Sequence, residues 1–336
     1  SNVGNGPGGC YTVHYAAASA GQQLTIRWTL SNLRGGADGN VTLQAAAMTA
    51  TGFNNPPAVG LSSPANNTSV SAGTSLILTA TAHDGDGTVA LVEFFANGIL
   101  LGAATASPFS YLWSAVPAGV HVLTAKATDN QGATSFSSPA EIFVNGIGGS
   151  LQGSLTSPPS LPGAVNLTGE GTRDWAHWGL ATNSLFNRKA GVDSQISDIT
   201  KWGTNAVELY TDNSTAYSWS DGTPTAIAND ATKGVFTTGV TNGFEFTVPA
   251  DPTPRTLKVY VGLYGAQGNF QAWLSDFSGP AFVSTSLSNY YGSAYAAYTL
   301  IYAAASPQQT LTVRYRSLAL FDQDFGNVTL QAATLT

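Results

Sequence analysis

The stretch Leu257-Lys258-Val259-Tyr260-Val261-Gly262-Leu263-Tyr264 decides the fold, because aliphatic side chains occupy every second position along it. Successive side chains of a β-strand point to opposite faces of the sheet, so this pattern predicts a strand with one face in a core. The same period recurs from Phe244, from Phe270 and from Leu311, and no segment keeps a helical period over three turns. We therefore expect an all-β chain of tandem β-sandwiches, with a complete jelly-roll sandwich over residues 163–336.

Residues 55–145 contain a second series of short alternating segments. The apolar positions of three of them begin at Leu76, Val92 and Leu123. Turn signals such as Asp84-Gly85-Asp86-Gly87 separate them. About seven such strands in about ninety residues predict a separate β-sandwich.

This second region resembles the bacterial immunoglobulin-like modules of large surface proteins and polysaccharide-degrading enzymes. The resemblance is carried by Ala80–Val89, Val92–Phe95 and Ala125–Thr134. It implies a spacer that sets the distance between neighbouring modules, and it implies no reaction. Residues 146–162 are rich in Gly, Ser and Pro, so we expect a linker there.

The last region resembles galactose-binding-type β-sandwiches, a fold that many carbohydrate-binding modules share. Its size, its strand spacing, the closing segment Gly326–Ala333 and the stretch Gly171–Gly179 carry this resemblance. It implies that the chain comes from a large secreted or surface bacterial protein and that this module binds sugar. Because sandwiches of this kind host many functions, the resemblance alone does not assign one.

An internal repeat adds a third module. Residues Tyr11–Thr49 align without gaps on Tyr298–Thr336, with 21 identities in 39 positions. We therefore expect residues 1–50 to be the C-terminal part of another galactose-binding-like module, a partial jelly-roll that a neighbouring chain or segment completes. Two or three strands bury too little apolar area to fold alone.

The charge content of the sequence indicates where the protein works and which partners are excluded. Charged residues make up 9% of the chain, against about 25% in a typical soluble domain, and the net charge is −7. This balance suits an extracellular or cell-surface protein, and the absence of a Lys/Arg cluster argues against nucleic acid as a partner. The single Cys10 allows no internal disulfide, and no run of about 18 apolar residues predicts a membrane span.

Two sets of aromatic and basic residues are candidate sugar-binding sites, because sugars stack on flat aromatic faces and bond to polar side chains. Alternation places the first set on the outer faces of predicted strands: Tyr260, Tyr264, Trp273, Arg314 and Arg316. The second set lies in predicted loops: Trp175, His177, Trp178, Trp219, Tyr290 and Tyr291. The alternative for both sets is structural, since loops that cover a sheet turn its outer aromatics into a minor core.

One metal site is a candidate. Asp84 and Asp86 lie in a Gly-rich turn and have the oxygen ligands that calcium prefers. The alternative is turn chemistry, in which the same residues cap backbone groups. Apart from this structural calcium we expect no cofactor.

The sequence contains no catalytic motif. It has no Gly-x-Ser-x-Gly, His-Glu-x-x-His or phosphate-binding loop, and its four histidines are spread over three modules. A pair of carboxylates that catalyses glycoside hydrolysis is still possible. The spacing along the sequence does not single out any such pair among the candidates Glu170, Asp174, Asp193, Glu208, Asp276 and Asp322. We therefore expect no enzyme.

Two functions fit these observations. The first is a non-catalytic binding and adhesion array whose partner is a polysaccharide or a cell-surface glycan. The second is a structural subunit of an extracellular filament, in which a neighbouring subunit completes residues 1–50 by edge pairing.

Overall fold

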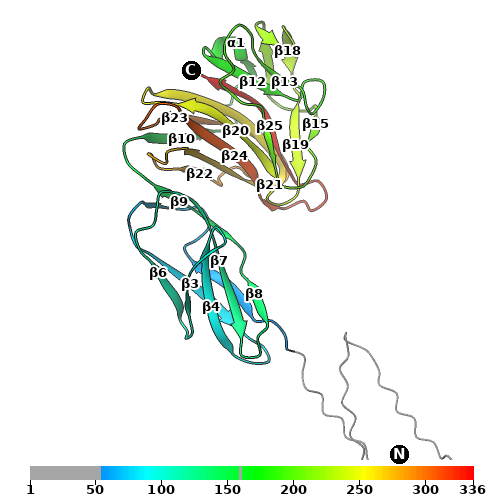
Figure 1. Ribbon diagram of the computed structural model, residues 1–336. Coiled ribbons are helices and arrows are strands. Elements are labelled where there is room, and N and C mark those ends of the chain that lie inside the picture. Colours follow the sequence, from blue (N-terminus) through cyan, green and yellow to red (C-terminus); the bar gives the residue numbers. More distant parts are fainter. Residues whose placement is uncertain (1–53, 159–160) are drawn as a thin grey trace, which may run out of the picture. The chain divides into compact units, whose positions relative to one another are not determined.

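The computed structural model describes residues 54–158 and 161–336, which are built from β-strands and one four-residue helix (Figure 1). Residues 54–336 form one compact unit. This confirms the predicted all-β fold with tandem sandwiches. The predicted partial module at residues 1–50 lies outside the described residues. No helix among the described residues is both long and apolar enough to cross a membrane.

The immunoglobulin-like module is a sandwich of two sheets. One sheet has the order β1-β3-β6 and the other the order β2-β9-β7-β4-β5, with β8 added to β7. Their bounds are β1 Ala58–Ser63, β2 Thr68–Ser71, β3 Leu76–His83, β4 Val89–Ala96, β5 Ile99–Ala104, β6 Phe109–Trp113, β7 Gly119–Asp129, β8 Thr134–Phe136 and β9 Ala140–Asn145.

The core of this module comes from the positions that alternation predicts. Leu78 on β3, Phe94 on β4 and Ala125 on β7 are fully buried. On each of these strands the residues directly before and after the buried one face outward. Burial of each larger side chain, such as Leu or Phe, contributes about 1.5–3 kcal/mol to the free energy of folding. This burial stabilises the module, which has no disulfide.

The C-terminal module contains the remaining strands and the helix. Their bounds are β10 Ser150–Thr156, β11 Ala164–Asn166, α1 Leu167–Glu170, β12 Asp174–Trp178, β13 Phe186–Lys189, β14 Thr200–Trp202, β15 Glu208–Tyr210, β16 Ala216–Trp219, β17 Gly222–Thr223, β18 Ala228–Ala231, β19 Gly234–Thr238, β20 Gly243–Ala250, β21 Arg255–Leu274, β22 Phe282–Ser284, β23 Ser288–Ala303, β24 Gln309–Leu320 and β25 Asn327–Leu335.

Strand β21 runs through both layers of this sandwich. Its first half pairs with β23 and β25, and its second half pairs with β22 and β24. The change of layer falls at Gly265, where φ is +50° and an added Cβ would lie 2.6 Å from the Cβ of Asp322. Glycine adopts this left-handed backbone at no steric cost, so it is suited to the bend.

The two halves of β21 define an inner and an outer face in each layer. Leu257, Val259 and Leu263 from the first half and Phe270 from the second lie in one core, with exposed fractions of 1% or less. These are the inward positions that the sequence predicts. The first layer also contains β10, β12, β13, β15, β17 and β19, and the second also contains β14 and β20.

A small third layer covers part of the first layer's outer face. The three-stranded sheet β11-β16-β18 and helix α1 carry Val165, Leu167 and Tyr217, which pack in a minor core with Tyr260 and Ala332. Asn166 caps the helix by accepting a hydrogen bond from the amide of Gly169 at 3.2 Å.

The predicted linker at residues 146–162 is wrong over 150–156, because these residues form β10. This strand pairs with β23 in unbroken register, from Ser150 opposite Ala303 to Thr156 opposite Ala297. The Gly and Ser residues of the segment conceal its alternation, in which Leu151 is buried and Gln152 is exposed. The connection between the modules is therefore short.

Candidate functional site

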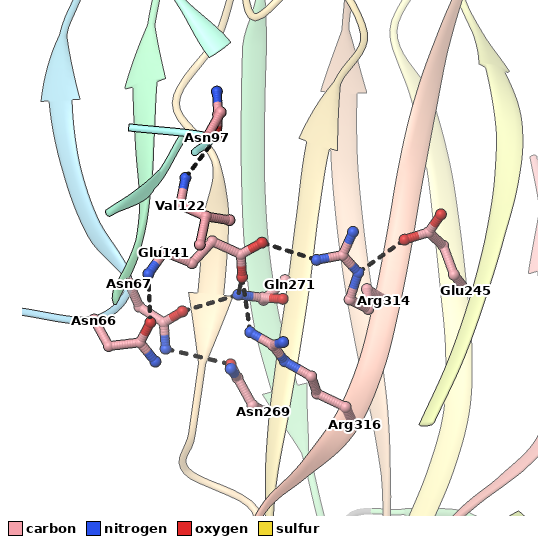
Figure 2. A network of polar contacts seen from close by, with 10 residues as sticks. All are labelled: Asn66, Asn67, Asn97, Val122, Glu141, Glu245, Asn269, Gln271, Arg314 and Arg316. Carbon is pink, nitrogen blue, oxygen red and sulfur yellow. Dashed lines mark hydrogen bonds and ion pairs between the residues drawn. The ribbon is translucent and has the colours of Figure 1, made fainter. Parts of the chain in front are cut away.

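The immunoglobulin-like module covers the outer face of the second layer, where the predicted site residues Trp273, Arg314 and Arg316 lie. Figure 2 shows the two arginines with their partners. Arg314 and Arg316 project from β24, and both form ion pairs with Glu141 on β9, at 2.9 and 2.7 Å. Arg314 also bonds to Glu245 on β20 at 2.8 Å. Trp273 contacts Phe143 of β9, with ring centroids 5.8 Å apart.

The centre of this network is buried. Arg314 is 6% exposed and Glu141 is 9% exposed. The guanidinium of Arg314 lies 3.7 Å from the ring centre of Trp202 and 4.8 Å from that of Trp273. Gln271 donates hydrogen bonds to Glu141 and to Asn67, at 2.9 and 2.8 Å. Trp273 and Arg314 therefore join the two modules and are not accessible to a ligand.

The third layer covers Tyr260 in the same way. Its ring is 1% exposed, and its hydroxyl donates a hydrogen bond of 2.6 Å to Glu170, to which Lys258 also binds. Burial, followed by the charge and hydrogen bond of Glu170, raises the pKa of Tyr260. Tyr260 is thus part of the minor core.

The buried aromatic residues of the loop set are structural as well. Trp175, Trp178 and Trp219 are at most 2% exposed. Each indole N–H has an acceptor, as for Trp175 with Asp221 at 2.9 Å and Trp178 with Asp198 at 3.0 Å. His177 is fully buried against Trp219, and this burial lowers the pKa of His177 to about 4 against an opposing effect of the Lys233 backbone.

Tyr264, by contrast, lines an open groove of about 650 Å³ on the outer face of the first layer. The groove crosses five neighbouring strands in the order β15-β19-β25-β21-β23. Strand register places one residue from each strand in a single row: Glu208, Phe236, Thr329, Gly262 and Tyr295. A parallel row contains Thr238, Asn327, Tyr264 and Ser293.

Gly262 is buried beneath two residues of the groove lining, Thr329 and Tyr295. An added Cβ would lie 2.5 Å from the Tyr295 ring, 2.6 Å from the hydroxyl of Thr329 and 2.9 Å from the carbonyl of Ala294. The missing side chain therefore lets the Tyr295 ring lie across β21. The Tyr295 hydroxyl donates to the carbonyl of Asp212 at 3.3 Å, which orients the ring.

The polar groups of the groove are acidic or neutral. Glu208, Asp212 and Asp324 line it, and its lining includes no Lys, Arg or His. None of these three carboxylates forms an ion pair within the described ranges 54–158 and 161–336. Burial raises the pKa of Tyr210, so its hydroxyl remains protonated where it accepts a hydrogen bond from Gln331.

Exposed aromatic rings continue beside the groove. Phe325, which is 68% exposed, belongs both to the groove lining and to the loop that closes on Gly265. Phe321 in the same loop stacks on Tyr290 at 4.9 Å, and Tyr290 contacts Tyr291 at 4.7 Å. Tyr290 and Tyr291 are 58% and 85% exposed. The structure thus exposes Tyr264, Tyr290 and Tyr291 among the predicted residues and buries most of the others.

Sequence reasoning missed most of the groove. Glu208, Tyr210 and Phe236 come from strands of three to five residues, too short to show a period. Of the six carboxylates considered for hydrolysis, only Glu208 lines the groove. Asp174, for example, is fully buried and accepts hydrogen bonds from the amides of Gln195 and Ile196 at 2.7 and 2.9 Å.

The predicted metal residues differ from each other in environment. Asp84 is 5% exposed, whereas Asp86 is exposed and accepts two hydrogen bonds of 3.0 Å from Asn55. Over residues 54–158 and 161–336, no three His, Cys, Asp or Glu side chains are arranged as a ready metal cluster.

Comparison with known proteins supports one of the two predicted resemblances directly. Residues 57–125 match the family model described as a bacterial Ig domain. No curated protein matches the sequence.

Several solved structures have a similar fold. The fibronectin(III)-like modules of Clostridium thermocellum CbhA are 24% identical, with coverage of 26% of this chain and 94% of theirs and a TM-score of 0.25. A carbohydrate-binding module of the β-sandwich superfamily is 13% identical, with coverage of 85% and 100% and a TM-score of 0.25. The Bacteroides ovatus protein SGBP-B, solved with a mixed-linkage heptasaccharide, is 10% identical, with coverage of 85% and 100% and a TM-score of 0.22. These likenesses concern fold and carry no argument about what this chain binds.

Proposed function

We propose that this protein binds an extracellular polysaccharide, without catalysis, in the groove across β15, β19, β25, β21 and β23. The observation that carries the proposal is the arrangement of Tyr264, Tyr295 and Phe325 around one open groove that also presents hydroxyl and amide groups. Aromatic faces stack on the C–H faces of sugars, and polar side chains bond to their hydroxyls. The groove volume of about 650 Å³ has room for several sugar units.

The negative charge of the groove indicates which class of polysaccharide it can bind. Three carboxylates that form no ion pair in the described part of the chain repel uronic acid and sulfate groups, and they attract protonated amines. The ligand we propose is therefore a neutral or amine-bearing polysaccharide. The immunoglobulin-like module has no part in this contact and instead holds the binding module in a fixed orientation through the network around Glu141.

Affinity electrophoresis on a panel of neutral, amine-bearing, uronic and sulfated polysaccharides tests the proposal. We expect retardation by at least one neutral or amine-bearing polymer and none by the anionic ones. The Tyr264→Ala and Tyr295→Ala variants should lose about tenfold in affinity, as for an aromatic hot spot. The matched control is Tyr291→Ala, which removes an exposed ring that is not in the groove lining and should bind as the wild type does.

Two results would contradict the proposal. Unchanged mobility of the protein on every polymer would show that it does not bind polysaccharide. Equal retardation of the wild type and both groove variants would show that binding occurs elsewhere than in the groove. The same polymers, incubated with the protein, should release no reducing ends. The Glu208→Gln variant separates the two ligand classes, because it should weaken binding of an amine-bearing polymer and leave binding of a neutral one nearly unchanged.

A further inference from the structure

Three buried oxygen atoms without hydrogen-bond partners lie at one end of the immunoglobulin-like module. They are Oδ2 of Asp84, Oδ2 of Asp129 and Oδ1 of Asn54. Asp84 follows β3 directly and Asp129 is the last residue of β7, and these two side chains are 5% and 2% exposed. A buried carboxylate oxygen without a partner is costly, so such groups are normally paired or bound to a metal.

Contacts around Gly87 place the side chain of Asp84 close to the segment that contains Asp129. An added Cβ on Gly87 would lie 2.5 Å from Oδ2 of Asp84 and 2.4 Å from Oδ1 of Asn130, the residue next to Asp129. The amide of Asp86 donates to Oδ1 of Asp84 at 3.5 Å, and the side chain of Asn54 lies within hydrogen-bonding reach of the Asp129 carboxylate.

The exposed Asp86 and the inner carboxylate oxygens have different roles. Asp86 accepts hydrogen bonds from the backbone and the side chain of Asn55, and thereby holds the segment 54–55 over the β3–β4 loop. Oδ1 of Asp129 accepts hydrogen bonds from the amides of Gln131 and Ala133 at 2.8 and 2.9 Å, whereas Oδ2 has no hydrogen-bond partner. Within residues 54–158 and 161–336, no cation forms an ion pair with Asp84 or Asp129.

We propose that Asn54, Asp84 and Asp129 bind one calcium ion. Calcium takes six to eight oxygen ligands in variable geometry and accepts carboxylate, amide and backbone carbonyl oxygens together with water. Two carboxylates and one amide oxygen supply the side-chain part of such a set. The ion neutralises the two buried charges and fixes segment 54–55 to the ends of β3 and β7. The set shares only Asp84 with the pair expected from the sequence.

Isothermal titration of the full chain with calcium chloride, after treatment with a chelator and desalting, tests the proposal. Extracellular calcium modules have a Kd of about 10⁻⁴–10⁻³ M, and we expect binding in that range. A calcium concentration about 100 times Kd should also raise the Tm of the module by at least about 5 °C, because calcium binds the folded state. Magnesium should bind more weakly, because it demands a stricter octahedral geometry.

The Asp129→Asn variant keeps an oxygen for the Gln131 and Ala133 amides but loses the second carboxylate oxygen. It should fold, as circular dichroism will show, and bind calcium at least tenfold more weakly. Asp84→Asn should behave in the same way. The control is Asp193→Asn, which removes an exposed carboxylate of the other module and should leave calcium binding unchanged. Absence of heat and of a Tm shift at 10 mM calcium would overturn the proposal, as would wild-type affinity in both Asp84→Asn and Asp129→Asn.

Discussion

Tyr260 and Tyr264 show how far a single residue can be interpreted from sequence. They lie on the same face of one strand, four positions apart, and alternation places both on the outer face. Tyr260 is 1% exposed and Tyr264 is 36% exposed, because helix α1 and the sheet β11-β16-β18 cover the first and end before the second. Alternation predicts the face of a side chain, but it contains no information about what later packs on that face.

His177 gives a prediction at this scale. Its pKa is about 4 in the folded protein, against about 6.5 for an unfolded chain, so between these pH values the unfolded state binds more protons. Folding stability should therefore fall as the pH drops from 6.5 to 4, by about 3 kcal/mol from this residue. Urea unfolding at several pH values, followed by tryptophan fluorescence, measures the effect.

The His177→Gln variant should lose most of this pH dependence, since its side chain does not titrate. The exposed His83 provides the control, and His83→Gln should keep the wild-type slope. Identical slopes for wild type and His177→Gln would show that burial of this imidazole does not govern acid sensitivity.

At the scale of elements, strand β9 carries the contact between the modules. Alternation correctly predicts that Arg314 and Trp273 lie on the outer faces of β24 and β21. A basic side chain between aromatic rings matches the pattern of a sugar-binding site. Here, however, Arg314 pairs with Glu141, which lies on a strand about 170 residues away in the sequence. No local pattern in the sequence indicates that partner.

Glu141→Gln tests the contribution of this contact. The substitution keeps the shape of the side chain but leaves Arg316 unpaired and Arg314 with Glu245 alone. Breaking a buried ion pair from one side costs about 3 kcal/mol, so calorimetry should show a clear drop in Tm. The control is Glu93→Gln, whose more exposed bridge to Lys126 is worth about 1 kcal/mol at most. Equal melting of the two variants would contradict a stabilising interface.

At the scale of the whole molecule, the strand pattern predicts two of the modules and their inner cores well. It fails at the connection, where Gly and Ser conceal β10, and it fails for the groove, which is assembled from five strands far apart in sequence. The repeat relation of residues 1–50 and their pairing with a neighbouring subunit remain predictions. The filament alternative depends on that segment, whereas the binding proposal depends on the described groove.

Hydrogen exchange of the full chain, with and without a polysaccharide that retards it, tests whether the groove is the binding surface. We predict slower exchange in peptides that cover the groove edges at 208–212 and 321–327, with no change in the immunoglobulin-like module. Protection confined to residues 54–145, or unchanged exchange at both groove edges under saturating polysaccharide, would contradict it.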